Sequence, residues 1–148
     1  MQEHFKLFTS LIASINRDIR HVKTQIMEKH NLRCPHVSTL YYLYVDDGLT
    51  LKELCEKCNE DKGAISRSVK SLEEEGLVKT HTAQKKYKQK LKLTEKGKEI
   101  GKDVAEKIDI AVKLAIQNLT DEDKACVYSS LKTISENLEK VVFTTEKV

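Results

Sequence analysis

Hydrophobic residues recur every three or four positions along the beginning of the chain, from Phe5 to Ile26. This spacing is typical of an amphipathic helix whose apolar side chains form one stripe. A stripe that continues over three heptads favours packing against another helix, either in the chain's own core or in a second subunit, and the pattern leaves both open. The residues of the stripe are Phe5, Phe8, Ile12, Ile15, Ile19, Val22 and Ile26.

A second helix is predicted to begin at Cys34-Pro35, because proline at the first helical position loses no hydrogen bond. Its apolar face includes Leu40 and Tyr44. We expect it to end near Gly48, since glycine readily adopts the left-handed conformation of a helix C-cap.

The next segment predicts two short helices with a tight turn between them. Thr50 and Glu53 match a capping box, in which each side chain satisfies a free N–H at the start of a helix. That helix runs to about Cys58, and Asp61 then caps a second helix that extends through Glu75. Two short helices in this arrangement form a helix-turn-helix, whose second helix enters the DNA major groove. The predicted buried positions of the second helix are Ile65, Val69 and Leu72.

The period changes after Gly76, where residues 77–82 and 88–93 suggest two strands. Together they predict a basic hairpin, although its turn lacks an Asn-Gly or Asp-Gly pair. Thr94 then caps a long helix that ends near Leu119, and Thr120 begins a last amphipathic helix with acidic residues in its first turn. The sequence therefore predicts a mainly α protein of six helices with a small β-hairpin.

Composition fits this picture and adds the distribution of charge. The 148 residues include one Pro, five Gly and no Trp, and 33% are charged, as expected for a helix-rich chain. Nine basic and three acidic residues lie between Lys62 and Lys92, so that segment carries +6, whereas the rest of the chain carries −3 of the total of +3. A cationic segment on a mildly anionic body is typical of a protein that binds a polyanion.

Targeting signals and thiols indicate the compartment. The first residues lack the basic and apolar regions of a signal peptide, and charges interrupt every apolar run before it reaches the length of a membrane span. We therefore expect a cytoplasmic protein with no membrane partner. Four cysteines in that compartment are expected to be free thiols.

Three segments carry a resemblance to a known family. They are residues 50–54 (TLKEL), 66–78 (SRSVKSLEEEGLV) and 93–97 (LTEKG), framed by a long helix at each end. In this order and spacing the chain resembles the MarR family, the regulators named for multiple antibiotic resistance, over essentially its whole length. The resemblance implies a single MarR-like unit over residues 1–148, with a winged helix-turn-helix region at about 33–93 and dimerisation helices at 1–30 and 95–145.

A homodimer that addresses the two halves of a near-palindromic site in double-stranded DNA is also implied by the resemblance. Apolar side chains at both chain ends agree with it, because they would otherwise face water. The residues predicted at the dimer interface are Phe5, Phe8, Ile12, Leu138, Val141, Val142 and Phe143.

The second helix of the helix-turn-helix supplies the candidate DNA-reading residues. Arg67 is the preferred base reader, since its planar fork can donate to guanine N7 and O6 together. Gly63 and Ala64 either permit close approach or a thymine methyl contact, or serve only as spacing, which is the preferred interpretation. The predicted DNA contacts of this helix are Lys62, Ala64, Ser66, Arg67 and Lys70.

The hairpin supplies a lysine-rich wing consisting of Lys85, Lys86, Lys88 and Lys90. The wing departs from the family pattern because it has no Arg, and a lysine is a mobile point charge that suits phosphate contacts better than insertion into the minor groove. A solvated hairpin is the alternative. The family also commonly contacts the DNA backbone near Pro35 and His36, although His36 can equally be a surface histidine.

Four cysteines raise the question of a metal site or a thiol switch. Cys55 and Cys58 are predicted to pack as small hydrophobic residues, and the further ligands of a zinc site are missing, so no metal is expected. Cys34 is the better thiol candidate, because a helix start stabilises a thiolate. A packed or incidental Cys34 is the preferred interpretation.

These observations predict a sequence-specific, double-stranded-DNA-binding transcriptional regulator. The resemblance further implies a repressor that a small aromatic or phenolic effector releases. Two alternatives stay open: a winged-helix protein-interaction module and a thiol-based redox-sensing regulator. The sequence contains no convergent set of nucleophile, base and metal ligands, so we expect neither an enzyme nor a bound cofactor.

Overall fold

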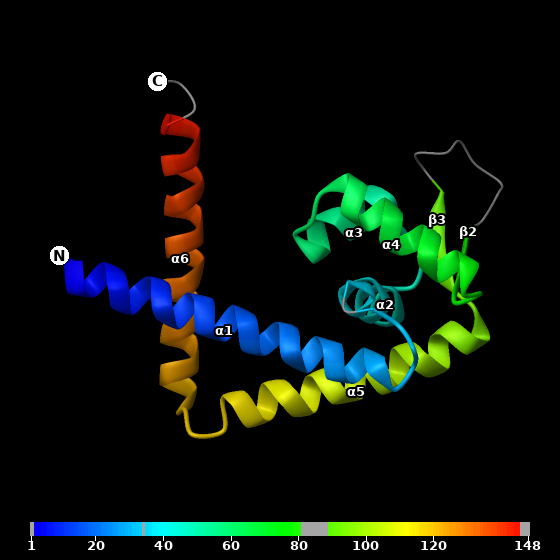
Figure 1. Cartoon of the computed structure of the whole chain (residues 1–148), viewed down its shortest axis with the longest axis horizontal. Helices are drawn as coiled ribbons and strands as arrows, with labels where there is room; N and C mark the ends of the chain where they lie inside the picture. The colour runs from blue at the N-terminus through cyan, green and yellow to red at the C-terminus, as the bar shows by residue number, and fades with distance from the viewer. Residues whose placement is uncertain (1, 34, 81–88, 146–148) are drawn as a thin grey trace. The chain divides into compact units, whose positions relative to one another are not determined.

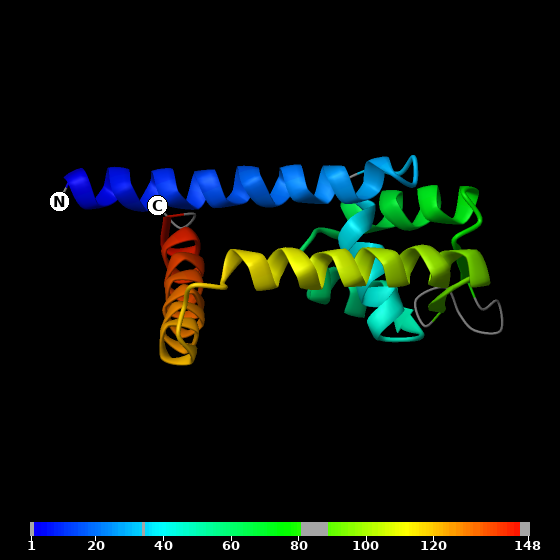
Figure 2. The ribbon, with the colours of Figure 1, turned by 90° about the horizontal axis from the view of Figure 1, so that it is seen from below.

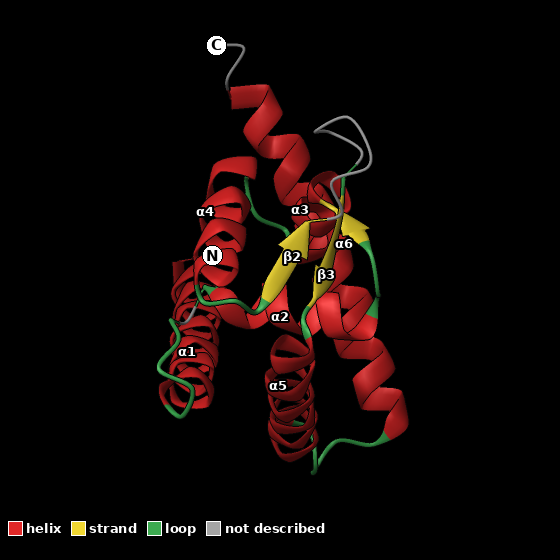
Figure 3. Ribbon diagram, turned by 90° about the vertical axis from the view of Figure 1, so that its right-hand side faces the viewer, coloured by secondary structure: helices red, strands yellow, loops and turns green. Residues whose placement is uncertain are grey.

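Helices make up most of the protein, and the strands form one small sheet (Figure 3). The computed structural model describes residues 2–33, 35–80 and 89–145. The chain forms two compact units, residues 1–110 and 111–148. This arrangement of elements confirms the predicted mainly α fold with a small β wing.

Figure 1 traces these elements along the chain. The helices are α1 (Gln2–Glu28), α2 (His36–Val45), α3 (Leu51–Cys58), α4 (Lys62–Glu74), α5 (Glu95–Ala115) and α6 (Asp121–Thr145). The strands are β1 (Leu49–Thr50), β2 (Val78–Thr80) and β3 (Lys90–Leu93). Among the described residues, no helix is long and apolar enough to cross a lipid bilayer.

The sheet has one strand more than the sequence predicted. Its order is β1-β3-β2, with both neighbours of β3 antiparallel to it. The predicted hairpin strands pair Val78 with Leu93 and Thr80 with Leu91, whereas Leu49 of β1 pairs with Leu91 from the other side. The added strand, β1, is only two residues long, and its second residue is also the N-cap of α3. It is therefore too short to show the alternation of apolar and polar residues that predicts a strand.

Local capping explains the helix-turn-helix formed by α3 and α4. The Thr50 hydroxyl accepts the Glu53 N–H, and the Glu53 carboxylate accepts the Thr50 N–H at 2.7 Å, which confirms the predicted capping box. Asn59 ends α3 in the left-handed conformation, with φ of 52°. The Asp61 carboxylate then accepts the Ala64 N–H at 2.9 Å and begins α4.

A hydrophobic core lies under these two helices. Met27 of α1, Leu40 of α2, Leu54 of α3, Leu72 of α4 and Val104 of α5 are fully buried. The central helix α2 packs against α1, α3, α4 and β3 (Figure 1). Burial of each large aliphatic side chain contributes roughly 1.5 to 3 kcal/mol, so this cluster holds α4 in a defined pose.

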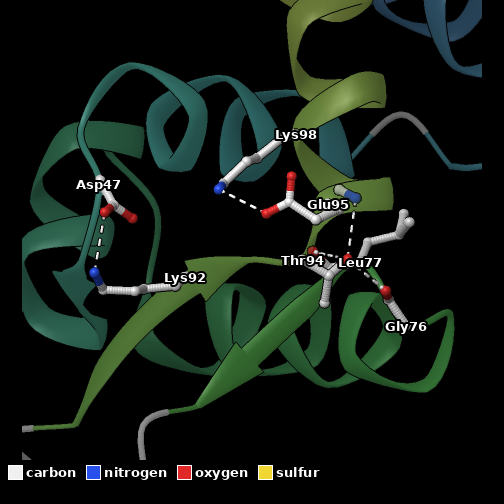
Figure 4. A network of polar contacts seen from close by, with 8 residues as sticks. Asp47, Gly76, Leu77, Lys92, Thr94, Glu95 and Lys98 are labelled. Carbon is white, nitrogen blue, oxygen red and sulfur yellow. Dashed lines mark hydrogen bonds and ion pairs between the residues drawn. The ribbon is translucent and has the colours of Figure 1, made fainter.

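The junction between sheet and α5 is fixed by polar contacts (Figure 4). The Thr94 hydroxyl donates to the Gly76 carbonyl at 2.7 Å and accepts the Gly97 N–H at 3.0 Å, which confirms Thr94 as the cap of α5. A Cβ atom at Gly97 would overlap the Leu77 carbonyl oxygen, so the start of α5 approaches β2 more closely than any other residue allows. Lys92 of β3 also pairs with Asp47 at 3.0 Å.

The N-terminal part of α1 extends beyond the winged-helix region (Figure 2). Its apolar side chains stay accessible: Leu11 is 52% exposed and Ile15 is 54% exposed. In the second unit, α6 begins with a reciprocal cap between Thr120 and Asp123. Several apolar side chains of α6 are exposed as well, among them Leu131 and Leu138.

Candidate nucleic-acid interface

Helix α4 has one buried face and one accessible face. Ile65, Val69 and Leu72 are buried, as predicted, and the Ser68 hydroxyl is buried with them, 3.1 Å from the Thr39 hydroxyl of α2. This hydrogen bond joins α4 to α2 and helps the apolar packing to orient α4. Of the residues predicted to contact DNA, Lys62, Arg67 and Lys70 are exposed, whereas Ala64 and Ser66 are half-buried.

The basic side chains on the accessible face of α4 differ in whether they form an ion pair. Lys70 lies 3.9 Å from the Glu74 carboxylate, one turn further along α4. Within the described part of the chain, the Lys62 ammonium and the Arg67 guanidinium form no ion pair. The Arg67 donors are therefore available to an anion or to a base edge.

The wing contributes exposed lysines on both of its strands. Lys90 of β3 and Lys79 of β2 are exposed, and Lys79 pairs in register with Lys92. Lys79 was not among the predicted site residues, although the alternation of Val78, Lys79 and Thr80 indicates an outward side chain. The predicted wing residues Lys85, Lys86 and Lys88 lie outside the described residues.

The start of α2 differs from expectation. Pro35 is exposed and stands just before the helix, as its N-cap. The interpretation of His36 as a surface histidine is wrong: its side chain is buried, and its Nδ1 accepts the Arg33 N–H at 3.4 Å. Burial, followed by the charge of Arg33, lowers the pKa of His36, while Glu75 raises it. A buried and uncharged imidazole is poorly suited to a phosphate contact.

A cavity of about 410 Å³ lies between α1 and the helix-turn-helix. Ile19, Arg20 and Lys23 line it from α1, whereas Ile65 and Ser68 line it from α4. The Lys23 ammonium donates to the Ser38 hydroxyl of α2 at 3.2 Å. The cavity therefore combines apolar walls with basic groups, and its volume lies within the range of small-molecule sites. The residues that line the cavity were not predicted from sequence, because they come from four separate helices.

Comparisons with known proteins agree with this architecture. A model of the MarR family matches residues 30–86, which hold the helix-turn-helix. The helix-turn-helix part of the chain is therefore similar to the MarR family. It is 28% identical over 102 residues to YybA, an HTH-type transcriptional regulator of Bacillus subtilis, and the match covers 68% of each chain.

Solved MarR-family structures share the fold. A putative MarR family transcriptional regulator from Listeria monocytogenes, complexed with 26mer DNA, superposes with a TM-score of 0.80 at 21% identity, covering 94% of this chain and 93% of that one. A Staphylococcus aureus MarR in complex with salicylate and kanamycin superposes with a TM-score of 0.75 at 22% identity, covering 94% of each chain.

The residues predicted to lie at a dimer interface belong to the two terminal helices. In α1, Phe8 and Ile12 are exposed, and in α6, Leu138 and Val141 are exposed. The side chains of Phe5, Val142 and Phe143 lie outside the described part of the structure. An exposed stripe of this length is unusual for a surface that faces only water.

The cysteines of the helix-turn-helix pack against the core, as predicted. Burial is the main cause that raises the pKa of Cys55, and burial with the neighbouring Cys55 thiol raises the pKa of Cys58 to about 11. Both are therefore weak nucleophiles near neutral pH. The thiol candidate Cys34 lies outside the described residues. In the described ranges, no group of three His, Cys, Asp or Glu side chains is placed to hold a metal ion.

Proposed function

We propose that this chain is a homodimeric, sequence-specific, double-stranded-DNA-binding transcriptional regulator, and that it is a repressor released by a small-molecule effector. The observation that carries the proposal is the pose of α4. Its apolar face is buried in the core, and its opposite face presents Arg67 and Lys62, which form no ion pair with the residues that the structure describes. The DNA complex of the Listeria neighbour supports the same use of this fold.

We propose different roles for the basic residues of α4 and of the wing. Arg67, on a rigid helix, is suited to bidentate recognition of guanine, and this contact is worth roughly 1 to 3 kcal/mol of discrimination. Lys90 and Lys79, on the wing, are suited to phosphates, which position the protein without reading sequence. Lys62 and Lys70 are proposed to contact the DNA backbone beside the bases that Arg67 reads.

The dimer is proposed from the exposed apolar stripe on α1. A second copy of the chain is the occupant that fits, because the stripe includes Phe8, Ile12, Ile15 and Ile19 and continues for several turns. Two copies would present two recognition helices at a fixed spacing, which matches a near-palindromic site.

The effector is proposed to bind in the cavity beside α4. Apolar walls suit an aromatic ring, and Arg20 and Lys23 suit a carboxylate or phenolate group, while Glu60 limits how much negative charge fits. A ligand that prefers a different separation of α1 and α4 would shift the population of recognition-helix poses and thereby lower DNA affinity. The salicylate complex of the staphylococcal neighbour supports a ligand of this class.

Selection of bound fragments from random DNA, followed by affinity measurements at several salt concentrations, tests the central proposal. We expect Arg67→Ala to lose preference at one base pair in each half-site, and Lys90→Ala to weaken all duplexes similarly and to flatten the salt dependence by about one charge. Salt-insensitive binding of a protein partner, without DNA binding, would instead support an interaction module.

Salicylate serves as the probe for the effector component. We expect it to bind the full chain and to lower affinity for the selected DNA, and we expect Lys23→Ala to weaken both effects. If salicylate either fails to bind or binds without changing DNA affinity, the effector component is contradicted while DNA binding stands.

A further inference from the structure

The first turn of α4 holds an arrangement that the proposed function does not require. Gly63 and Arg67 are four residues apart, so their positions lie one above the other on the same face of the helix. Side chains in a helix lean toward its N-terminus, and a long side chain at position 67 therefore passes over position 63.

The structure places the end of the Arg67 side chain beside the space that a Cβ atom at residue 63 would fill. A Cβ atom built at Gly63 would lie 3.3 Å from Arg67 Nη1 and 3.0 Å from Asp61 Oδ1. The guanidinium and the capping carboxylate thus border the point that a side chain at residue 63 would fill. The carboxylate is held there because it accepts the Ala64 N–H at 2.9 Å.

This arrangement brings the Arg67 donors to the N-terminal end of the helix. Base-reading contacts of a recognition helix come mainly from its N-terminal residues, which lie deepest in the major groove. A methyl group at residue 63 would move Arg67 Nη1 outward by a few tenths of an ångström, because the Asp61 carboxylate on the other side is held by the cap. A bidentate contact depends on the position of both nitrogens, so a displaced guanidinium donates to the base edge less well.

We infer that Gly63 is a specificity-determining position, because its missing side chain lets the Arg67 guanidinium lie over the first turn of α4. Gly63 acts through Arg67 and is a positioning residue. The inference rests on the proposed function and deepens it. It replaces the interpretation of Gly63 as mere spacing.

A double-mutant cycle tests this inference, with Gly63→Ala, Arg67→Ala and the double variant in the full chain. The Arg67→Ala background is the matched control, because the methyl group and its effect on helix propensity are present but no guanidinium is displaced. We expect Gly63→Ala to reduce preference at the base pair read by Arg67 by about fivefold, the low end for a bidentate contact, and to change nothing further in the Arg67→Ala background.

Two results would overturn the inference while leaving the function intact. One is an unchanged base preference in Gly63→Ala when Arg67→Ala loses it. The other is an equal change in both backgrounds, which would mean that the methyl group acts on DNA directly. If the unaltered chain binds no duplex, the proposed function itself fails.

Thermal unfolding of each variant accompanies the binding data. If crowding of the Asp61 cap unfolds Gly63→Ala, the same cycle is run in the Asp61→Ser background. Serine is also a good N-cap and lacks the carboxylate oxygen that lies 3.0 Å from the added methyl group. The same fivefold criterion then applies.

Discussion

The two ends of α1 have the same residue types and the same period but opposite surroundings. At the C-terminal end, Ile26 is 6% exposed and Met27 is fully buried against the winged-helix core. Toward the N-terminal end, Leu7 is 59% exposed, and Ile15 at the middle of the helix is 54% exposed. The comparison teaches that the winged-helix region closes its own core within one chain, whereas the rest of the stripe stays exposed, as the proposed dimer requires.

The largest expected difference in the free energy of unfolding is between truncating a side chain of the winged-helix core and truncating one of the exposed α1 stripe. Leu72→Ala is expected to lower the free energy of unfolding by about 2 to 5 kcal/mol, because it leaves a cavity in the closed core. Ile15→Ala is expected to change it by less than about 0.5 kcal/mol in the isolated subunit, as for other exposed positions. Urea unfolding of both variants over a range of protein concentrations measures the two effects.

The concentration series supplies the control for this pair. Association stabilises the folded state by mass action, so the cost of Ile15→Ala should grow as the protein concentration rises. If Ile15→Ala costs as much as Leu72→Ala at every concentration, the α1 stripe belongs to an intramolecular core and the comparison fails.

Removing a buried and an exposed hydroxyl tests the same contrast between the closed core and an exposed helix. Thr39→Val removes the partner of the buried Ser68 hydroxyl and is expected to cost about 1 to 3 kcal/mol. Thr133→Val on α6 is the matched control: its hydroxyl is exposed and donates to the Ser129 carbonyl at 3.0 Å, so we expect less than about 0.5 kcal/mol.

Removing both members of the buried pair completes this test. Thr39→Val with Ser68→Ala should cost less than the sum of the two single changes, because no buried hydroxyl is left unpaired. Additive costs, measured by the same urea unfolding, would show that the pair contributes nothing as a pair.

A smaller effect is expected where α5 meets the C-terminal end of α1. Hydrogen bonds from Lys107 and His30, at 2.6 and 2.7 Å, are the main causes that lower the pKa of Asp103 to about 2. The unfolded chain then binds more protons than the folded chain between about pH 4 and pH 2, so stability is lost as the pH falls through this window. Because the carboxylate is partly exposed, we expect a loss of only about 1 kcal/mol.

Asp103→Asn is the control for the acid effect. It cannot titrate, so its free energy of unfolding should fall less steeply than that of the unaltered chain between pH 4 and pH 2. Parallel curves for the two proteins, followed by circular dichroism in acid, would mean that the Asp103 contacts do not stabilise the fold.

Local signals were the most predictable from sequence. The Thr50 and Glu53 capping box, the Asp61 cap and the Thr94 cap are confirmed because each depends on residues only three positions apart. The buried face of α4 followed from its period. The two-residue strand β1 was missed, since Leu49 pairs with Leu91, which lies 42 residues further along the chain.

Features that depend on how several helices pack together could not be predicted from the sequence pattern. The burial of His36 and the cavity between α1 and α4 arise only when separate helices pack together. The stripe on α1 was evident, but the point at which it passes from exposed to buried was not, because the period is the same on both sides. The roles of Arg67, Lys90 and the dimer residues remain predictions.

Footprinting of the purified chain on its selected DNA fragment tests the central claim most directly. A pair of recognition helices held by the α1 stripes predicts two protected half-sites with two-fold symmetry, with centres about 10 base pairs apart or a multiple of that distance. Protection of a single half-site, or of none at low salt, would contradict the account.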